Sequence, residues 1–166
     1  MSHIAKIAAG AALVFGLGPA AHAQVLMERN ISMQMAMTAF QGAVEECKKS
    51  GSNDITVAIV DRAGQVALLA RANNASPHNL ELARRKAYTA RTFRSTTMAW
   101  RDRTAAGTAN APQRQLAEVI ALGGGVPIVT GDEGIGGIGV SGSNGGQKGD
   151  EDCAKGGLAA IQAQLQ

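Results

Sequence analysis

Apolar residues recur at helical spacing in some segments of the chain and in strand-type runs in others. Within residues 28–49, one apolar stripe has spacings of four, three, four and three: Met33, Met37, Phe40, Val44 and Cys47. This pattern predicts a helix whose stripe faces the core. Lys48 and Lys49 suit its end, because the C-terminus of a helix dipole favours cations, and polar residues follow.

Two pairs of strand-type segments predict two β-hairpins. Residues 55–60 and 65–71 are rich in β-branched and apolar residues and are joined by a short turn. Residues 126–130 and 135–141 form a second pair, again with a glycine-containing turn between them. Pro127 has no amide hydrogen to donate, so its strand is predicted at an edge of the sheet, or Pro127 lies among its first residues.

Further helices are predicted between and after the hairpins. Residues 77–94 form one, with Ser76 as a capping residue and a proline at the first helical position. A short helix or irregular segment is expected over residues 96–106, a helix over 113–122, and a last helix from Asp150 onwards. Hairpin-connected strands alternating with helices predict one α+β domain with an antiparallel sheet.

Residues 1–23 have the layout of a secretory signal peptide. A positively charged end precedes an apolar run at residues 7–17, and the small residues Ala21 and Ala23 occupy the third and first positions before Gln24. A membrane anchor is a poorer interpretation, because the run is short and a Gly-Pro pair ends it. We therefore predict a periplasmic or secreted domain of residues 24–166, with no membrane span once the signal is removed.

Charge and composition limit the classes of partner. Lysine and arginine number 16 against 13 acidic residues, and aromatic residues are 3% of the chain, which does not favour nucleic-acid binding. Basic residues are concentrated between residues 84 and 103. A run of this kind is usually a solvated helix face, but it could also attract a small organic anion. Its seven bases are Arg84, Arg85, Lys86, Arg91, Arg94, Arg101 and Arg103.

The two cysteines, Cys47 and Cys153, both lie in the predicted exported domain. An oxidising compartment permits a disulfide between them, which would close a loop of about a hundred residues and stabilise the fold by at most ~4–5 kcal/mol. The alternative is two separate buried thiols, and the sequence leaves both open. The absence of a Cys-x-x-Cys pair argues against a thioredoxin-like site.

The remaining reactive side chains exclude several kinds of site. His78 is the only histidine between residues 24 and 166, which rules out a zinc site built from several histidines. No Gly-x-Ser-x-Gly motif supports a hydrolase, and no catalytic residue is predicted. Met33, Met35 and Met37 could form a soft-metal thioether site, but Met33 and Met37 lie on the predicted core stripe, which favours core filling.

His78 has two interpretations that the residues alone leave open. It is either a solvent-facing histidine without a role, or a neutral imidazole at a helix start that serves as an axial ligand for haem iron. In the second case, Lys86 and Arg91 on the same helix could meet the propionates, with Tyr88 beside them.

A set of motifs in order resembles the GlcG/HbpS family of haem-binding domains. They are Val57-Ala-Ile-Val-Asp61 with Gly64, Arg84-Arg-Lys-Ala-Tyr-Thr-Ala90, Gly124-Gly-Val-Pro-Ile128, Gly136-Gly-Ile-Gly-Val-Ser-Gly142, Asp150-Glu-Asp-Cys-Ala154 and Gly157-Leu158. The resemblance implies an α+β, profilin/PAS-like domain with a five-stranded antiparallel sheet, homo-oligomeric assembly, and ligand-facing positions between residues 78 and 91. It also implies haem binding, and in some relatives slow oxidative breakdown of haem.

These observations lead to an expected function with one alternative. We expect an exported haem-binding protein, with weak haem-degrading activity as an extension, and His78, Lys86, Tyr88 and Arg91 as its ligand-facing residues. The alternative is a non-catalytic binding or sensory partner module for a small organic anion or another exported protein.

Overall fold

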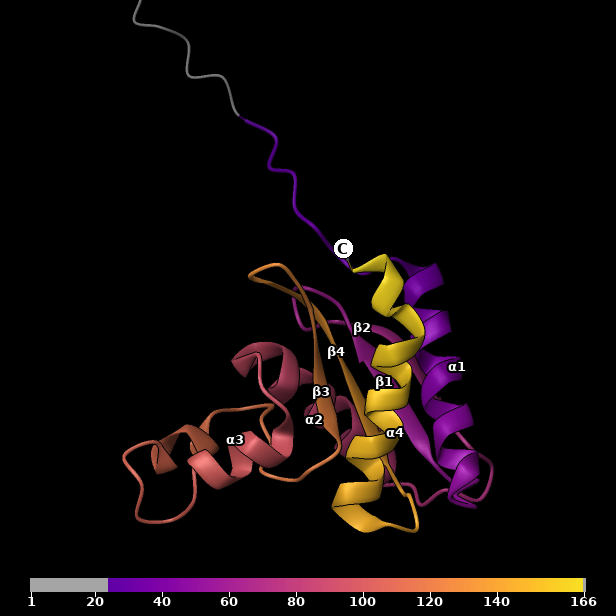
Figure 1. The fold of residues 1–166 in the computed structure, drawn as a ribbon. Helices are drawn as coiled ribbons and strands as arrows, with labels where there is room; N and C mark the ends of the chain where they lie inside the picture. Colours follow the sequence, from indigo (N-terminus) through magenta and orange to yellow (C-terminus); the bar gives the residue numbers. More distant parts are fainter. Residues whose placement is uncertain (1–23, 166) are drawn as a thin grey trace, which may run out of the picture.

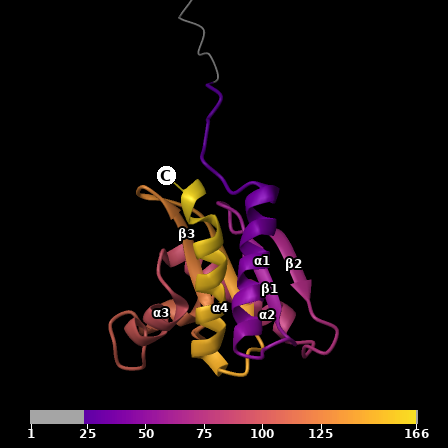
Figure 2. The same cartoon turned by 45° about the vertical axis from the view of Figure 1, so that its right-hand side comes forward.

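The computed structural model describes residues 24–165, which form one α+β domain around a four-stranded antiparallel sheet. The strand order is β2-β1-β4-β3, so the two hairpins meet along β1 and β4. Helices α1 and α4 lie side by side on one face of the sheet, and α2 covers the other (Figures 1 and 2). The elements are α1 (Met33–Lys49), β1 (Thr56–Val60), β2 (Val66–Arg71), α2 (Asn79–Phe93), α3 (Thr97–Arg103), η1 (Ala111–Gln115), β3 (Gly125–Thr130), β4 (Glu133–Ser141), α4 (Gly146–Ile161) and η2 (Gln162–Gln164).

The α+β class, the single domain, both hairpins and the edge position of Pro127 are as predicted, but the number of strands is not. The resemblance implied five strands, whereas residues 24–165 form four. Each hairpin supplies two strands, and the segment between α3 and β3 contains only the short helix η1 and irregular backbone. No further described segment therefore extends the sheet beyond its edge strands β2 and β3.

Side chains of the central strand β1 alternate between two separate clusters. Val57 and Ile59 pack with α1 and α4 in the larger core, whereas Ala58 and Val60 pack with Ala83 of α2. All five β1 residues are buried because both faces of the sheet are covered.

Helix α1 buries only part of the predicted stripe: Cys47 is buried and Phe40 and Val44 pack against the core, but Met33 and Met37 do not. Its buried residues are Ala36, Ala39, Ala43 and Cys47, whereas the Met33 and Met37 side chains are 57% and 45% exposed. The reason is close packing against α4: a Cβ at Gly42 would lie 2.5 Å from that of Ala160. Only small residues fit such a contact, so the prediction that Met33 and Met37 fill the core is wrong. The helix also begins at Met33, because the Ser32 hydroxyl caps it by accepting from the Met35 amide.

Three other helix predictions need correction. The last helix, α4, begins at Gly146 rather than at Asp150. Helix α2 begins at Asn79, and His78, rather than Ser76, is its N-cap residue. The helix predicted over residues 113–122 is absent: η1 ends at Gln115, and Glu118 has a left-handed φ of 69°. The segment is too short to nucleate a helix alone, and its backbone is held instead by the Thr89 hydroxyl, which accepts from the Ile120 amide.

A disulfide joins Cys47 at the end of α1 to Cys153 in α4, with a Cα–Cα distance of 5.0 Å. The pairing of β1 with β4 brings the two helices to the same end of the sheet. Of the two alternatives left open by the sequence, the structure therefore has the bridge. No helix in the described part of the chain is long and apolar enough to span a membrane.

Candidate functional site

His78 lies at the start of α2, where the β2–α2 connection meets the helix. His78 is exposed, and its backbone is already in the right-handed helical region. Its side chain makes no capping hydrogen bond. The imidazole is therefore accessible to a ligand from solvent.

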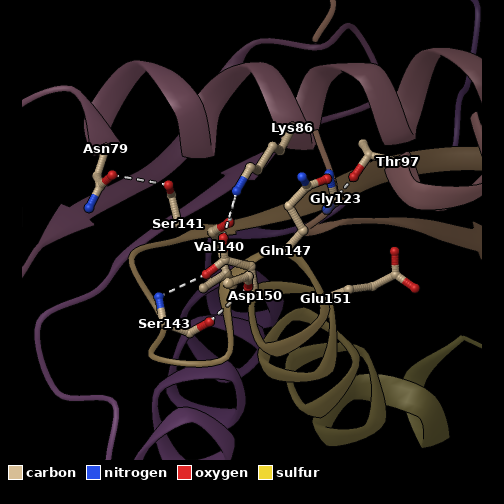
Figure 3. A network of polar contacts seen from close by, with 12 residues as sticks. Asn79, Lys86, Thr97, Gly123, Val140, Ser141, Ser143, Gln147, Asp150 and Glu151 are labelled. Atoms are coloured by element: carbon tan, nitrogen blue, oxygen red, sulfur yellow. Dashed lines mark hydrogen bonds and ion pairs between the residues drawn. The ribbon is translucent and has the colours of Figure 1, made fainter. Parts of the chain in front are cut away.

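The side chain of Lys86, unlike the exposed His78, points into the protein. Its side chain is 3% exposed, and its ammonium donates to Asp150 Oδ2 at 2.7 Å and to the Val140 carbonyl oxygen at 3.0 Å (Figure 3). Burial lowers the pKa of Lys86 below its usual value, and the Asp150 carboxylate opposes that shift. The expected role of Lys86 in binding propionates does not fit this position, because its charge is already paired in the interior.

The acceptor, Asp150, belongs to a polar network that connects both faces of the sheet. Its Oδ1 accepts from the Ser143 amide at 2.8 Å, which holds the loop that enters α4. On the far side, the Ser141 hydroxyl donates to Asn79 Oδ1 at 3.1 Å, which ties the end of β4 to the first residue of α2 (Figure 3). The network therefore fixes α2, β4 and α4 relative to one another.

A run of three glycines passes through this network just before β3. Gly123 N donates to Gln147 Oε1 and Gly125 N donates to Thr97 Oγ1, both at 2.8 Å. Between them, Gly124 has a φ of 122°, and a Cβ there would lie 3.0 Å from Lys86 Nζ. Glycine is required here because the backbone passes directly against the ion pair.

Tyr88 and Arg91 contact other parts of the domain. A Cβ at Gly64, in the β1–β2 turn, would lie 2.8 Å from the Tyr88 ring, so this ring covers the turn. Arg91 is half-buried beside Gly137 of β4, and its Nε is buried with no hydrogen-bond partner in the described structure. The four residues predicted from the sequence thus do not converge on one point within a single chain.

The basic run between residues 84 and 103 is partly neutralised by its neighbours. Arg84 pairs with Glu118, Arg85 Nη1 lies 3.4 Å from Glu81, and Lys86 pairs with Asp150 as described. The run is therefore not a continuous free cationic surface.

Three cavities of the described residues are small. Their volumes are about 230, 220 and 230 Å³, below the roughly 300–1,000 Å³ of typical small-molecule sites. The first is an apolar groove between α1 and β2, with Phe40 and Val44 on one side and Ala70 and Arg71 on the other. None of the three is lined by a residue of the predicted ligand set. No group of three or more His, Cys, Asp or Glu in residues 24–165 is placed to hold a metal ion.

Sequence reasoning missed Asp150 as the partner of Lys86. A signal was present: Lys86 lies three residues after Ala83 and four before Ala90, at the spacing of the buried face of α2. A lysine on a buried face needs a counter-charge, although the sequence alone does not say which carboxylate supplies it.

The family model described as "Haem degrading protein HbpS-like" matches residues 31–159. The chain belongs to the HbpS-like family. This HbpS-like chain is also similar to solved structures. The crystal structure of HbpS is 29% identical, with a TM-score of 0.76 over 83% of this chain and 94% of that one. A double mutant of HbpS from Streptomyces reticuli gives the same identity and score over 92% and 98% of the two chains.

Two further neighbours extend the comparison. A PduOC:heme complex is 28% identical, with a TM-score of 0.72 over 80% of this chain and 96% of that chain. The ORFY protein of Klebsiella pneumoniae is 20% identical with a TM-score of 0.77 over 85% and 97%, which shows a shared fold. No match was found among curated protein sequences.

Proposed function

We propose that this HbpS-like protein binds haem. The observation that carries the proposal is the family match over residues 31–159, supported by the 28% identical neighbour solved as a heme complex. When bound, haem would supply an iron centre able to take an axial ligand and to undergo redox chemistry.

His78 fits the role of iron ligand. Its imidazole is exposed and unoccupied by hydrogen bonds in the described structure, and a neutral imidazole is a common haem ligand. Arg91, which is half-buried on the same helix, is the proposed propionate partner, and Tyr88 lies one turn before it. Lys86 is not part of the proposed ligand set. If its ammonium turned away to bind a propionate, Asp150 would be left buried without a counter-charge.

A porphyrin would have to bind at the surface of the chain, since the three cavities are too small to enclose it. His78 would then hold the iron, and a second copy of the chain, in keeping with the homo-oligomer expected from the resemblance, would exclude water from it.

The test is a titration of the purified protein with hemin, followed by its Soret absorbance. We expect stoichiometric binding, a changed Soret position in His78→Ala, and weaker binding in Arg91→Ala, with Arg103→Ala on the exposed side of α3 as the matched control. An unchanged spectrum in His78→Ala would remove His78 from the proposal. No Soret shift in the wild-type protein would remove haem binding itself.

Export and slow haem breakdown are further parts of the proposal. The disulfide between Cys47 and Cys153 supports an oxidising compartment. Expression of the whole chain in a bacterial host should give a periplasmic product whose mass corresponds to an N-terminus at Gln24, and a cytoplasmic product of full mass would contradict export.

Haem breakdown would appear as loss of Soret intensity with iron release after a reductant is added, and a stable spectrum would contradict it.

A further inference from the structure

Methionines are concentrated at one point of the chain. Of six methionines in the sequence, four fall within residues 27–37: Met27, Met33, Met35 and Met37. They span the segment that leads into α1 and the first turns of the helix.

The core does not account for this concentration. The fully buried residues of α1 are alanines and Cys47, and Phe40 and Val44 pack against the same core. Of the methionines on α1, only Met35 packs against it. Met33 and Met37 are exposed, as is Met27 in the segment before the helix. An apolar side chain left in water gains nothing from the hydrophobic effect, so packing gives no reason for these methionines.

Met33 and Met37 are four residues apart on one helix. Side chains at this spacing lie on the same face, with their Cβ atoms about 5–6 Å apart. Each methionine has three rotatable side-chain bonds, so the two thioether sulfurs can turn toward one ion without any change in the backbone. Met35 lies on another side of the helix and lines a different groove, with Thr130 and Ile135.

Thioethers are soft, neutral ligands that select Cu(I) over harder ions such as magnesium or calcium. Both cysteines are closed in the Cys47–Cys153 disulfide, and the described chain has no free thiol. Methionines are thus the reduced sulfur ligands that this surface offers. Because they carry no proton, binding through them requires none to be released.

We propose that Met33 and Met37 form a surface site for Cu(I) at the start of α1. The ion arrives as Cu(I) and stays Cu(I): two sulfur lone pairs replace weaker ligands, and no electron is transferred. This site is independent of the proposed haem ligand, since it uses neither His78 nor any residue of α2.

The experiment is an anaerobic titration of the purified protein with the acetonitrile complex of Cu(I), with bicinchoninate as the competing chromophore. No reductant is added, so the disulfide stays closed. Ag(I), which does not change oxidation state under these conditions, serves as a second probe. We expect one equivalent to bind, and Met33→Leu with Met37→Leu to weaken binding by about tenfold or more.

Met35→Leu is the matched control, since it changes a methionine of the same helix that lies off the proposed site; its affinity should equal that of the wild type. Leucine is a good helix former and the two site positions are exposed, so the double variant should keep its fold, which circular dichroism checks. In protein labelled with ¹³C at its methionine methyls, Ag(I) should shift the signals of Met33 and Met37 and leave that of Met98 in place.

Equal affinity of the wild type and the double variant would overturn the proposal, as would failure of the wild type to compete with bicinchoninate. Loss of Cu(I) binding in His78→Ala, with no loss in the double variant, would assign the ion to the imidazole instead. None of these results depends on whether the protein binds haem.

Discussion

Lys86 and Asp150 form a buried ion pair that joins helices on opposite faces of the sheet, with Nζ and Oδ2 2.7 Å apart. The pair lies beside the end of β4, where the Val140 carbonyl oxygen accepts a second hydrogen bond from the Lys86 ammonium. Two charges with side-chain exposures of 3% and 7% tolerate burial only while each satisfies the other. The pair is therefore a structural connection through the domain, although the sequence places Lys86 among surface-type bases.

Replacing Lys86 by methionine should strongly destabilise the fold. The change removes the ammonium and leaves the Asp150 carboxylate buried with only the Ser143 amide as partner, for which we expect a loss of about 3–5 kcal/mol in the free energy of unfolding. Urea denaturation followed by circular dichroism measures it. Lys148→Met is the matched control, because Lys148 pairs with Asp152 on the exposed side of α4 and should cost no more than about 0.5 kcal/mol.

The double variant Lys86→Met with Asp150→Leu separates pairing from packing. Removing both charges leaves no uncompensated carboxylate, so this variant should recover much of the stability lost in Lys86→Met. Additive losses from the two single changes would contradict a direct coupling between the two side chains.

The sequence predicted the order of the main elements because that order depends on local patterns. The strand-type runs became β1 with β2 and β3 with β4. The buried face of α1 was mispredicted, since hydrophobic spacing alone favoured methionines. Which face is buried depends on how close α4 comes, and that is set by Gly42 and Ala160, which are far apart in sequence.

The candidate site was less predictable for a similar reason. His78 could be singled out from residue type, and its exposure fits the proposed binding role, whereas Arg91 is half-buried. The position of Lys86 depends on a carboxylate 64 residues away, on an element across the sheet. Residue type and spacing along one helix do not contain that information.

The Cys47–Cys153 disulfide should contribute substantially to stability. It closes a loop with a sequence separation of 106, and the chain-entropy account assigns about 4–5 kcal/mol to a loop of that size. Unfolding in urea with and without dithiothreitol measures the contribution, with the thiols counted in each state. A double Cys47→Ser, Cys153→Ser variant is the control, whose stability should not respond to the reductant. Two titratable thiols in the untreated, denatured protein would contradict the bridge.

Substituting alanine at Gly124 should disrupt the network around the ion pair. The residue has a φ of 122°, and an added Cβ would lie 2.6 Å from the Val140 carbonyl oxygen and 2.7 Å from the Asp150 Cβ. Neither neighbour can move without disrupting the end of β4 or the Lys86–Asp150 ion pair. The loss of stability should therefore greatly exceed the cost of backbone strain alone. Gly107→Ala is the matched control: its φ of 85° carries strain of about 1–2 kcal/mol, but nothing lies within 4 Å of the new methyl group. Thermal unfolding of both variants measures the difference, and equal losses would mean that close approach to the ion pair is not what requires glycine at position 124.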